Sequence, residues 1–456
     1  LLRLKDGGLG AMTGPGTGDV FVHEVPACAG AHLLSFDAGY RGSERRERFY
    51  ASHEWAIDLL RRLHTGVLAA QTTHEEEASL FYVPAFFALL LALHDAASLA
   101  CLVAAVGKLA AHSAFRRNAG YDHFYLHGLE QPVLADFDYA EGRGRPKAQA
   151  AERLFEAFYA TLQNAAILAT GDLSQGTLAA ALGGALYGMR RVINVPFVLE
   201  EDCQGPGLKR TVRMAFVGSV QPYNWERVLF FRALQAEFGE RLRLHASGRA
   251  VLDHPHVQLR ALVRLDPHDP PLNTSHRAAF GARRGRLDKL YRRTELCVVA
   301  PGDAPVLGKR LSDAVAAGCV PVVLTGPGAY PVLPLQGAVR WDEFAVFVQL
   351  GDDAAGARWA LRRLLRLSNA ELARRREALL RWRPRLALGR GPDCAGRDLG
   401  PGAAELAIEE LRRLGWRRQL PLGGLALNAT SRACGATPMS PRCGALAGLL
   451  PSWGSA

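Results

Sequence analysis

The sequence predicts an α/β protein made of two Rossmann-like domains that face a cleft. Three observations support this prediction. Strand-like and helix-like segments alternate through most of the chain, a polar stretch rich in Gly and Pro at residues 200–210 interrupts them, and the alternation then restarts. At 456 residues the chain also exceeds the size of one ordinary core. We therefore expect an N-terminal domain at residues 19–200 and a C-terminal domain at residues 201–388.

The strands expected in the N-terminal domain are short and mostly apolar. They comprise residues 19–26, 80–84, 123–126, 166–169 and 191–195. A helix is expected at residues 44–63, where apolar side chains recur near helical spacing, and others within residues 86–112 and 151–163. The apolar run that begins at Leu80 is about 14 residues long, shorter than the ~20 that span a bilayer, so it predicts buried elements and no membrane span.

The C-terminal domain repeats the pattern. The expected strands are residues 212–217, 242–245, 296–299 and 320–324, and the expected helices are residues 224–238, 287–293, 307–317, 354–367 and 370–382. The periodic pattern is absent from both ends of the chain. Residues 1–18 predict a flexible segment, and residues 389–456, rich in Gly, Ala and Pro, predict a weakly ordered appendage.

The composition narrows the class of protein. Hydrophobic residues make up 49% and charged residues 22%, which excludes a wholly disordered or fibrous chain. The net charge of +11 favours an anionic ligand, a polyanion or a membrane surface without choosing among them. Much of the excess lies in residues 358–418, with sixteen arginines against seven acidic residues. The eight cysteines form no C-x-x-C pair, so a zinc ribbon or a thioredoxin-type motif is not expected.

The stretch of residues 296–324 has the strongest functional pattern. It is predicted to form a strand, a loop containing Gly302 and Asp303, a helix and a second strand. A helix that follows such a loop offers free backbone N–H groups and the positive end of its dipole to a phosphate. Lys309 and Arg310 fall in the first turn, where cations oppose the dipole unless an anion compensates them. The alternative interpretation is a surface helix with two solvated cations.

Two known motifs, a Walker A loop and an Asp-x-Asp metal site, are not favoured by the sequence. The same loop is close to a Walker A motif, but five residues separate its glycines and Arg310 replaces the hydroxyl that would hold Mg²⁺, so a nucleoside triphosphatase is not predicted. Asp136 and Asp138 could share a divalent ion, but we favour a polar loop. The sequence therefore predicts no metal site.

Asp122 and His123 follow a Gly turn at the start of a predicted strand. Such a pair could supply a general base that faces the cleft, or equally a turn-forming Asp and a hydrogen-bonded core His. Glu54, within the expected helix at residues 44–63, could be a second functional carboxylate or, as we favour, helix surface.

Taken in order, these stretches resemble a known family, the exostosin-type glycosyltransferases. The segments that carry the resemblance are Val20–Pro26, Phe49–Glu54, Glu77–Pro84, Asn118–Phe124, Arg210–Gly218, Cys297–Val323 and Trp341–Val346. The chain departs from the family pattern in the second half, where one extra residue lies between Gly302 and Arg310 and Leu335 replaces an aromatic residue.

The resemblance implies a GT-B fold and an inverting sugar transfer without a cofactor or an essential metal. The donor would be a nucleotide-diphosphate sugar, a UDP-sugar, bound in the C-terminal half, and the acceptor would be a glycan or glycoprotein over the N-terminal half. The expected donor contacts are Gly218, Gly302, Asp303, Lys309, Arg310 and Asp313. Asp122 is the first choice for the general base and His123 the second, with Glu54 as an acceptor contact.

The resemblance also implies a location and leaves one alternative open. The protein would be a type II Golgi membrane protein with a lumenal catalytic domain, anchored by a segment preceding Leu1. The alternative is a catalytically inactive family member that binds an acidic glycan through residues 358–418. A nucleic-acid partner is not expected, because these residues contain few interleaved aromatic side chains and no groove-binding motif.

Overall fold

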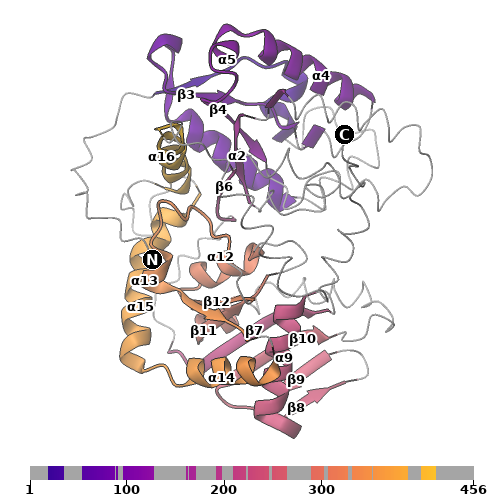
Figure 1. Ribbon diagram of the computed structural model, residues 1–456, viewed down its shortest axis with the longest axis vertical. Coiled ribbons are helices and arrows are strands. Elements are labelled where there is room, and N and C mark those ends of the chain that lie inside the picture. The colour runs from indigo at the N-terminus through magenta and orange to yellow at the C-terminus, as the bar shows by residue number, and fades with distance from the viewer. Residues whose placement is uncertain are drawn as a thin grey trace, which may run out of the picture.

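The computed structural model contains two α/β domains, each built around one sheet. It describes residues 19–34, 54–87, 89–90, 96–127, 161–162, 164–170, 192–197, 209–221, 224–245, 249–263, 289–301, 307–326, 331–351, 353–388 and 402–416. The N-terminal domain is at the top of Figure 1 and the C-terminal domain is below it, along the longest axis of the molecule. The predicted segment at residues 1–18 lies outside the described residues.

The sheet of the N-terminal domain is entirely parallel, in the order β2-β1-β3-β4-β5-β6. Its strands are β1 (Val20–Val22), β2 (Gln71–Thr72), β3 (Leu80–Val83), β4 (His123–His127), β5 (Ala166–Ala169) and β6 (Val192–Asn194). Every residue of β3, β4 and β5 is buried, as expected for parallel strands covered on both faces. Its helices are α2 (Glu54–Leu68), α4 (Ala96–Ala111) and α5 (Ser113–Arg117), with short 3₁₀ turns η1 (Ala27–Ala29), η2 (Ala31–Leu34) and η3 (Glu75–Glu77).

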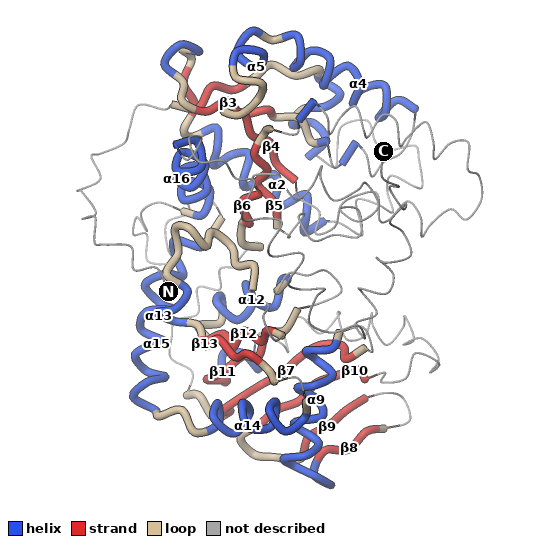
Figure 2. The backbone as a smooth tube through the Cα atoms, viewed as in Figure 1, coloured by secondary structure: helices blue, strands red, loops and turns tan. Residues whose placement is uncertain are grey.

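The sheet of the C-terminal domain has the order β13-β12-β11-β7-β10-β9-β8. Its strands are β7 (Val212–Val220), β8 (Leu242–Leu244), β9 (Arg249–Leu252), β10 (Val257–Val263), β11 (Thr294–Val299), β12 (Val320–Thr325) and β13 (Val346–Gln349). Strand β9 pairs antiparallel with both β8 and β10, and the other pairs are parallel. Its helices are α9 (Trp225–Phe238), α12 (Gly308–Ala316), α13 (Trp341–Phe344), α14 (Ala354–Leu365) and α15 (Asn369–Trp382), with turns η4 (Gly239–Arg241) and η5 (Arg383–Leu386). Figure 2 shows α9 and α14 lying against this sheet.

The predicted alternation of strands and helices is confirmed on both sides of the linker. The hairpin formed by β9 and β10 was not predicted, because charged and polar residues interrupt its apolar pattern. The helix expected at residues 44–63 extends to Leu68, and its part before Glu54 lies outside the described residues.

The prediction that residues 389–456 form a weakly ordered appendage is wrong for residues 402–416. These residues include α16 (Ala403–Trp416), which contacts α2 and β6 of the N-terminal domain and buries Leu406 and Leu411. The contact is close, because a Cβ atom at Gly66 would lie 2.5 Å from the Cβ of Ala404. The sequence signal was weak, since Gly- and Pro-rich stretches on both sides diluted the apolar pattern of the helix. Residues 389–401 and 417–456 lie outside the described residues.

The two domains also meet at the carboxyl end of β6. The backbone N–H of Leu335, which follows β12, donates to the backbone oxygen of Asn194, the last residue of β6, at 2.7 Å. A segment of the C-terminal domain therefore contacts the carboxyl end of a strand in the first sheet, the kind of edge at which parallel α/β sheets bind ligands.

Two disulfide bonds lie within the described part of the chain, one in each domain. Cys28 pairs with Cys101, and Cys297 pairs with Cys319. The scattered spacing of the cysteines gave no pairing in advance. Among the helices that the structure describes, none has both the length and the hydropathy that a membrane span requires.

Candidate functional site

Helix α12 begins at the carboxyl edge of the second sheet, one loop after β11. Gly308 is its first residue and has a φ of +59°, and Lys309 and Arg310 lie in its first turn as predicted. No side chain caps the N-terminus, so its first backbone N–H groups are not satisfied by a capping residue. This end of the helix combines two cations with a positive dipole end, a combination suited to an anion. Gly302 and Asp303 lie outside the described residues.

Asp313 lies one turn further along α12 and pairs with both cations. Its Oδ1 lies 2.5 Å from Lys309 Nζ and its Oδ2 lies 3.4 Å from Arg310 Nη1. The Lys309 and Arg310 side chains are about one third exposed, at 30% and 34%. The two cations therefore share one carboxylate partner, Asp313, and their side chains remain accessible to a ligand.

Arg227, which the sequence analysis did not select, lies on the same edge. It belongs to the first turn of α9, and its guanidinium donates to the backbone oxygens of Ser219 at 2.9 Å and Ala300 at 3.3 Å. These two oxygens belong to the ends of β7 and β11. Gly218 lies inside β7, and a Cβ atom there would be 3.7 Å from Arg227 Nη1. The structure therefore places the predicted donor residue Gly218 beside a cation that the prediction missed.

A buried tyrosine lies beneath the same group of charges. The Tyr291 side chain is fully buried, and its hydroxyl has no hydrogen-bond partner. Burial raises the pKa of Tyr291 to about 12, and the charges of Arg310, Asp313 and Arg227 also act on the phenol. Arg227 in the first turn of α9 and Arg310 in the first turn of α12 therefore both lie near the phenol of Tyr291.

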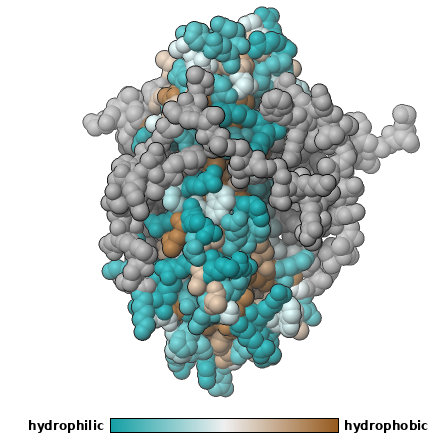
Figure 3. Space-filling model, turned by 90° about the vertical axis from the view of Figure 1, so that its left-hand side faces the viewer, coloured by the Kyte–Doolittle hydropathy of each residue, from teal (hydrophilic) through white to brown (hydrophobic). Residues whose placement is uncertain are grey.

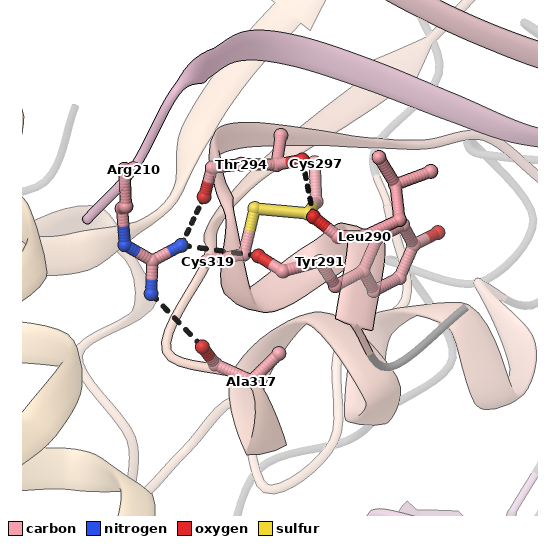
Figure 4. The surroundings of a disulfide bond; sticks show 7 residues. All are labelled: Arg210, Leu290, Tyr291, Thr294, Cys297, Ala317 and Cys319. Atoms are coloured by element: carbon pink, nitrogen blue, oxygen red, sulfur yellow. Dashed lines mark hydrogen bonds between the residues drawn. A yellow bond between two sulfur atoms is a disulfide. The ribbon is translucent and has the colours of Figure 1, made fainter. Parts of the chain in front are cut away.

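Arg210 supports α12 from its far end. Figure 4 shows its guanidinium donating to the backbone oxygens of Tyr291 at 3.1 Å, Ala317 at 2.9 Å and Thr294. Ala317 is the C-cap of α12, and the adjacent Cys297–Cys319 disulfide joins β11 to the turn that follows this helix. Burial, followed by the charge of Arg376, lowers the pKa of Arg210 to about 10, so the group stays protonated at neutral pH. The arginine and the disulfide together hold the helix that carries Lys309 and Arg310.

Asp122 and His123 lie at the opposite, amino edge of the first sheet. His123 is the first residue of β4, and its side chain is 0% exposed. Its Nδ1 lies 2.7 Å from Asp122 Oδ1 and its Nε2 lies 2.8 Å from Nε2 of His23, while Asn118 donates to Asp122. The ring stacks on Phe81 with centroids 4.9 Å apart. These contacts are those expected of a hydrogen-bonded core histidine, the alternative interpretation of this residue. The catalytic role of Asp122 and His123 stays a prediction.

The cluster of Asp122, His123 and His23 shifts the pKa values of its members. Burial, together with the neighbouring His123 and His112, lowers the pKa of His23 to about 3. Burial also lowers the pKa of His123, although the bond to Asp122 opposes it. Burial raises the pKa of Asp122, but hydrogen bonds from His123 and Asn118 outweigh it and the net shift is downward. The cluster is therefore stable with neutral imidazoles and an ionised carboxylate.

Acidification is expected to destabilise the N-terminal domain through this cluster. The pKa of His23 is about 3 in the folded state and about 6.5 when unfolded, so between these values the unfolded state binds more protons and stability falls as pH falls. From pH 7 to pH 5 the loss of unfolding free energy from His23 is about 2 kcal/mol, at roughly 1.4 kcal/mol per pH unit below 6.5. Urea unfolding at both pH values measures it, with His23→Gln expected to reduce the pH dependence. An equal dependence in the variant would contradict the assignment.

The structure provides little information on the remaining predicted site residues. Glu54 is the first residue of α2, and its side chain lies outside the described part, as do Asp136 and Asp138. Within the described ranges, no group of three or more His, Cys, Asp or Glu side chains is arranged to hold a metal ion.

Two α/β domains, one with a parallel sheet and one with a mostly parallel sheet, are arranged as the predicted GT-B fold requires, with a cationic helix N-terminus at the carboxyl edge of the second sheet. Residues 251–364, which run from β9 into α14, match the family model described as Exostosin GT47 domain. This match confirms the resemblance to the exostosin-type glycosyltransferases that the sequence motifs indicated. No curated protein matches the chain significantly.

Three solved structures align with the chain at low sequence identity and low TM-scores. The HepE protein of Anabaena (Alr3699), crystallised with UDP-glucose, aligns over 86% of this chain and 98% of its own, at 11% identity and a TM-score of 0.34. The GtfA/B complex aligns over 64% and 57%, at 8% identity and a TM-score of 0.31. The calicheamicin glycosyltransferase CalG4 aligns over 86% of both chains, at 14% identity and a TM-score of 0.27.

Proposed function

We propose that this chain transfers a sugar from a UDP-sugar to a glycan or glycoprotein acceptor, with inversion and without an essential metal ion. The observation that carries the proposal is the convergence of Arg227, Lys309 and Arg310 at the carboxyl edge of the second sheet. This edge lies within or next to the region that matches the exostosin domain. A diphosphate is the ligand whose charge and size suit two adjacent helix N-termini with three cations.

The chemistry follows from where negative charge develops. As the bond between the anomeric carbon and the phosphate oxygen breaks, its electrons go to the diphosphate, which must be stabilised as it leaves. The first backbone N–H groups of α12 and the side chains of Lys309 and Arg310 provide this stabilisation. The ligand phosphates replace Asp313 as the partner of these cations. An acceptor hydroxyl attacks from the opposite face and gives up its proton to a general base.

Calorimetry with UDP and uridine tests the donor assignment. UDP is expected to bind roughly 100-fold more tightly than uridine, because two charge-assisted hydrogen bonds contribute about 1.5 kcal/mol each. The preference should persist in EDTA. A panel of UDP-sugars, assayed for UDP release, then identifies the sugar. Equal affinity for UDP and uridine would exclude a diphosphate at this edge.

The alternative of an acidic-glycan module on residues 358–418 gains no support from the described side chains. Seven of the twelve arginines that the structure describes there have acidic partners: Arg358 and Arg362 pair with Glu237, Arg374 and Arg375 with Glu371, Arg381 with Glu377, Arg412 with Asp19, and Arg413 with Glu409. Figure 3, which faces the side of α15 and α16, displays a mainly hydrophilic described surface. These arginines are best explained as a solvated, ion-paired face.

A location in the Golgi lumen, with a membrane anchor outside this sequence, remains part of the proposal. The two disulfide bonds support it, because disulfides persist mainly in oxidising compartments such as the secretory pathway.

A further inference from the structure

The carboxyl edge of the first sheet carries a row of polar residues that the sequence analysis did not select. Strands β4 and β6 end at His127 and Asn194, and both are in register with Ala169, the last residue of β5 that lies between them. Residues in register on parallel strands direct their side chains to the same face. The small side chain of Ala169 thus separates an imidazole from an amide, and Thr170 follows directly at the end of β5.

Two polar atoms in this group are buried and lack partners. Thr170 is 4% exposed, and neither its Oγ1 nor Oδ1 of Asn194 has a hydrogen-bond partner. A buried polar group left unsatisfied costs about 1–3 kcal/mol, so its presence requires an explanation. The amino edge of the same sheet differs, because Asp122 and His123 satisfy one another there. The unused hydrogen-bonding capacity therefore lies at the carboxyl edge, where parallel α/β sheets bind ligands.

This edge also faces the domain that carries the donor site. The backbone oxygen of Asn194 accepts a hydrogen bond from Leu335 at 2.7 Å, and Leu335 lies in the segment that follows β12. Strand β12 pairs with β11, after which α12 and its cations begin. The polar row therefore lies at the edge of the first sheet that contacts the C-terminal domain.

We propose that His127, Thr170 and Asn194 form the acceptor side of the active site, with His127 as the general base. This inference rests on the proposed sugar transfer and assigns residues to its acceptor half. The Thr170 hydroxyl and the Asn194 amide oxygen hydrogen-bond hydroxyl groups of an acceptor sugar. A ring nitrogen of His127 takes the proton of the attacking hydroxyl as its oxygen bonds to the anomeric carbon. The electrons of the breaking bond leave with UDP, and the protonated imidazole releases its proton to solvent afterwards.

The test compares His127→Gln and Thr170→Val with wild type in the full chain. UDP release is measured from UDP-glucose, UDP-galactose, UDP-N-acetylglucosamine and UDP-xylose with pooled oligosaccharide acceptors, and UDP affinity is measured by calorimetry. His127→Gln is expected to lower turnover roughly 10²–10⁴-fold, to remove the acid limb of the pH–rate profile and to leave UDP affinity unchanged. Thr170→Val should raise the acceptor KM without lowering the melting temperature, because its hydroxyl has no partner in the fold. His64→Gln, which alters a half-buried histidine bonded to Tyr82, is the matched control with normal turnover.

The outcomes separate this inference from the proposed function. If wild type neither binds UDP nor releases it, the proposed function fails and this inference fails with it. If wild type is active and His127→Gln retains its rate and pH profile, only the acceptor assignment is overturned. A loss confined to Asp122→Asn would place the base at the amino edge and would also overturn it. Unfolding of Thr170→Val would show that the hydroxyl has a structural partner and would remove Thr170 from the site.

Discussion

Replacing Arg210 by methionine is expected to lower the free energy of unfolding of the C-terminal domain by about 3–5 kcal/mol. Methionine fills much of the same space but donates no hydrogen bond, so the backbone oxygens of Tyr291, Thr294 and Ala317 lose a charged donor together. Each of these oxygens belongs to a different part of the support of α12: a helical segment, a strand and the helix C-cap. Urea unfolding of the purified chain measures the loss.

Arg293→Met is the matched control for this experiment. Arg293 comes from a neighbouring segment and donates to the Thr211 hydroxyl at an exposed position. Its replacement should change stability by no more than about 0.5 kcal/mol, as is usual for surface positions. Equal losses in the two variants would mean that Arg210 is not the main support of α12.

Replacing Arg310 by alanine is expected to weaken UDP binding by roughly 10–100-fold, with little effect on stability. Hydrogen bonds to a charged group contribute about 1.5–3 kcal/mol, and alanine removes both the bonds and the charge. The ion pair that is lost, with Asp313, is partly exposed at 34% and 19% and adds little to folding. Calorimetry with UDP and a thermal melt measure the two effects separately.

Arg340→Ala serves as the control for Arg310→Ala. Arg340 is 66% exposed, pairs with Asp342 and is the N-cap residue of α13, so it belongs to a different helix from Arg310. UDP affinity should be unchanged in this variant. If both substitutions weakened UDP binding equally, the cause would be a general loss of positive charge, and the specific role of Arg310 would be disproved.

The position of Lys309 and Arg310 in the proposed donor site could be predicted because its pattern is local. Strand β11, the loop and α12 follow one another within residues 294–316, so apolar periodicity and a Gly-rich interruption were enough to place these two cations in the first turn of the helix. Arg227 and Tyr291 could not be found in this way. They join the site only because β7 lies next to β11 in the sheet, a pairing between residues about 80 positions apart that no local pattern encodes.

On the acceptor side, the prediction of Asp122 and His123 and the proposal of His127 concern the two ends of the same strand. His123 was expected to begin a strand, and a residue that begins a strand lies at the amino edge of a parallel sheet. The rule that ligands bind at carboxyl ends would have selected the last residue of the same strand, His127. The contact of His123 with His23 could not be anticipated, because His23 follows a strand one hundred residues earlier in the sequence.

The return of α16 to the N-terminal domain means that this domain is not encoded by one continuous stretch of sequence. The N-terminal fold takes a helix from residues 403–416, and Asp19 at its very beginning binds Arg412 near the end of that helix. A fragment that stopped after the linker would leave the flank of α2 around Gly66 bare, and one that started there would carry an orphaned apolar helix. A truncated form of this protein should therefore keep both segments that connect the two domains. Otherwise, residues 403–416 should be added to the N-terminal fragment as a separate peptide.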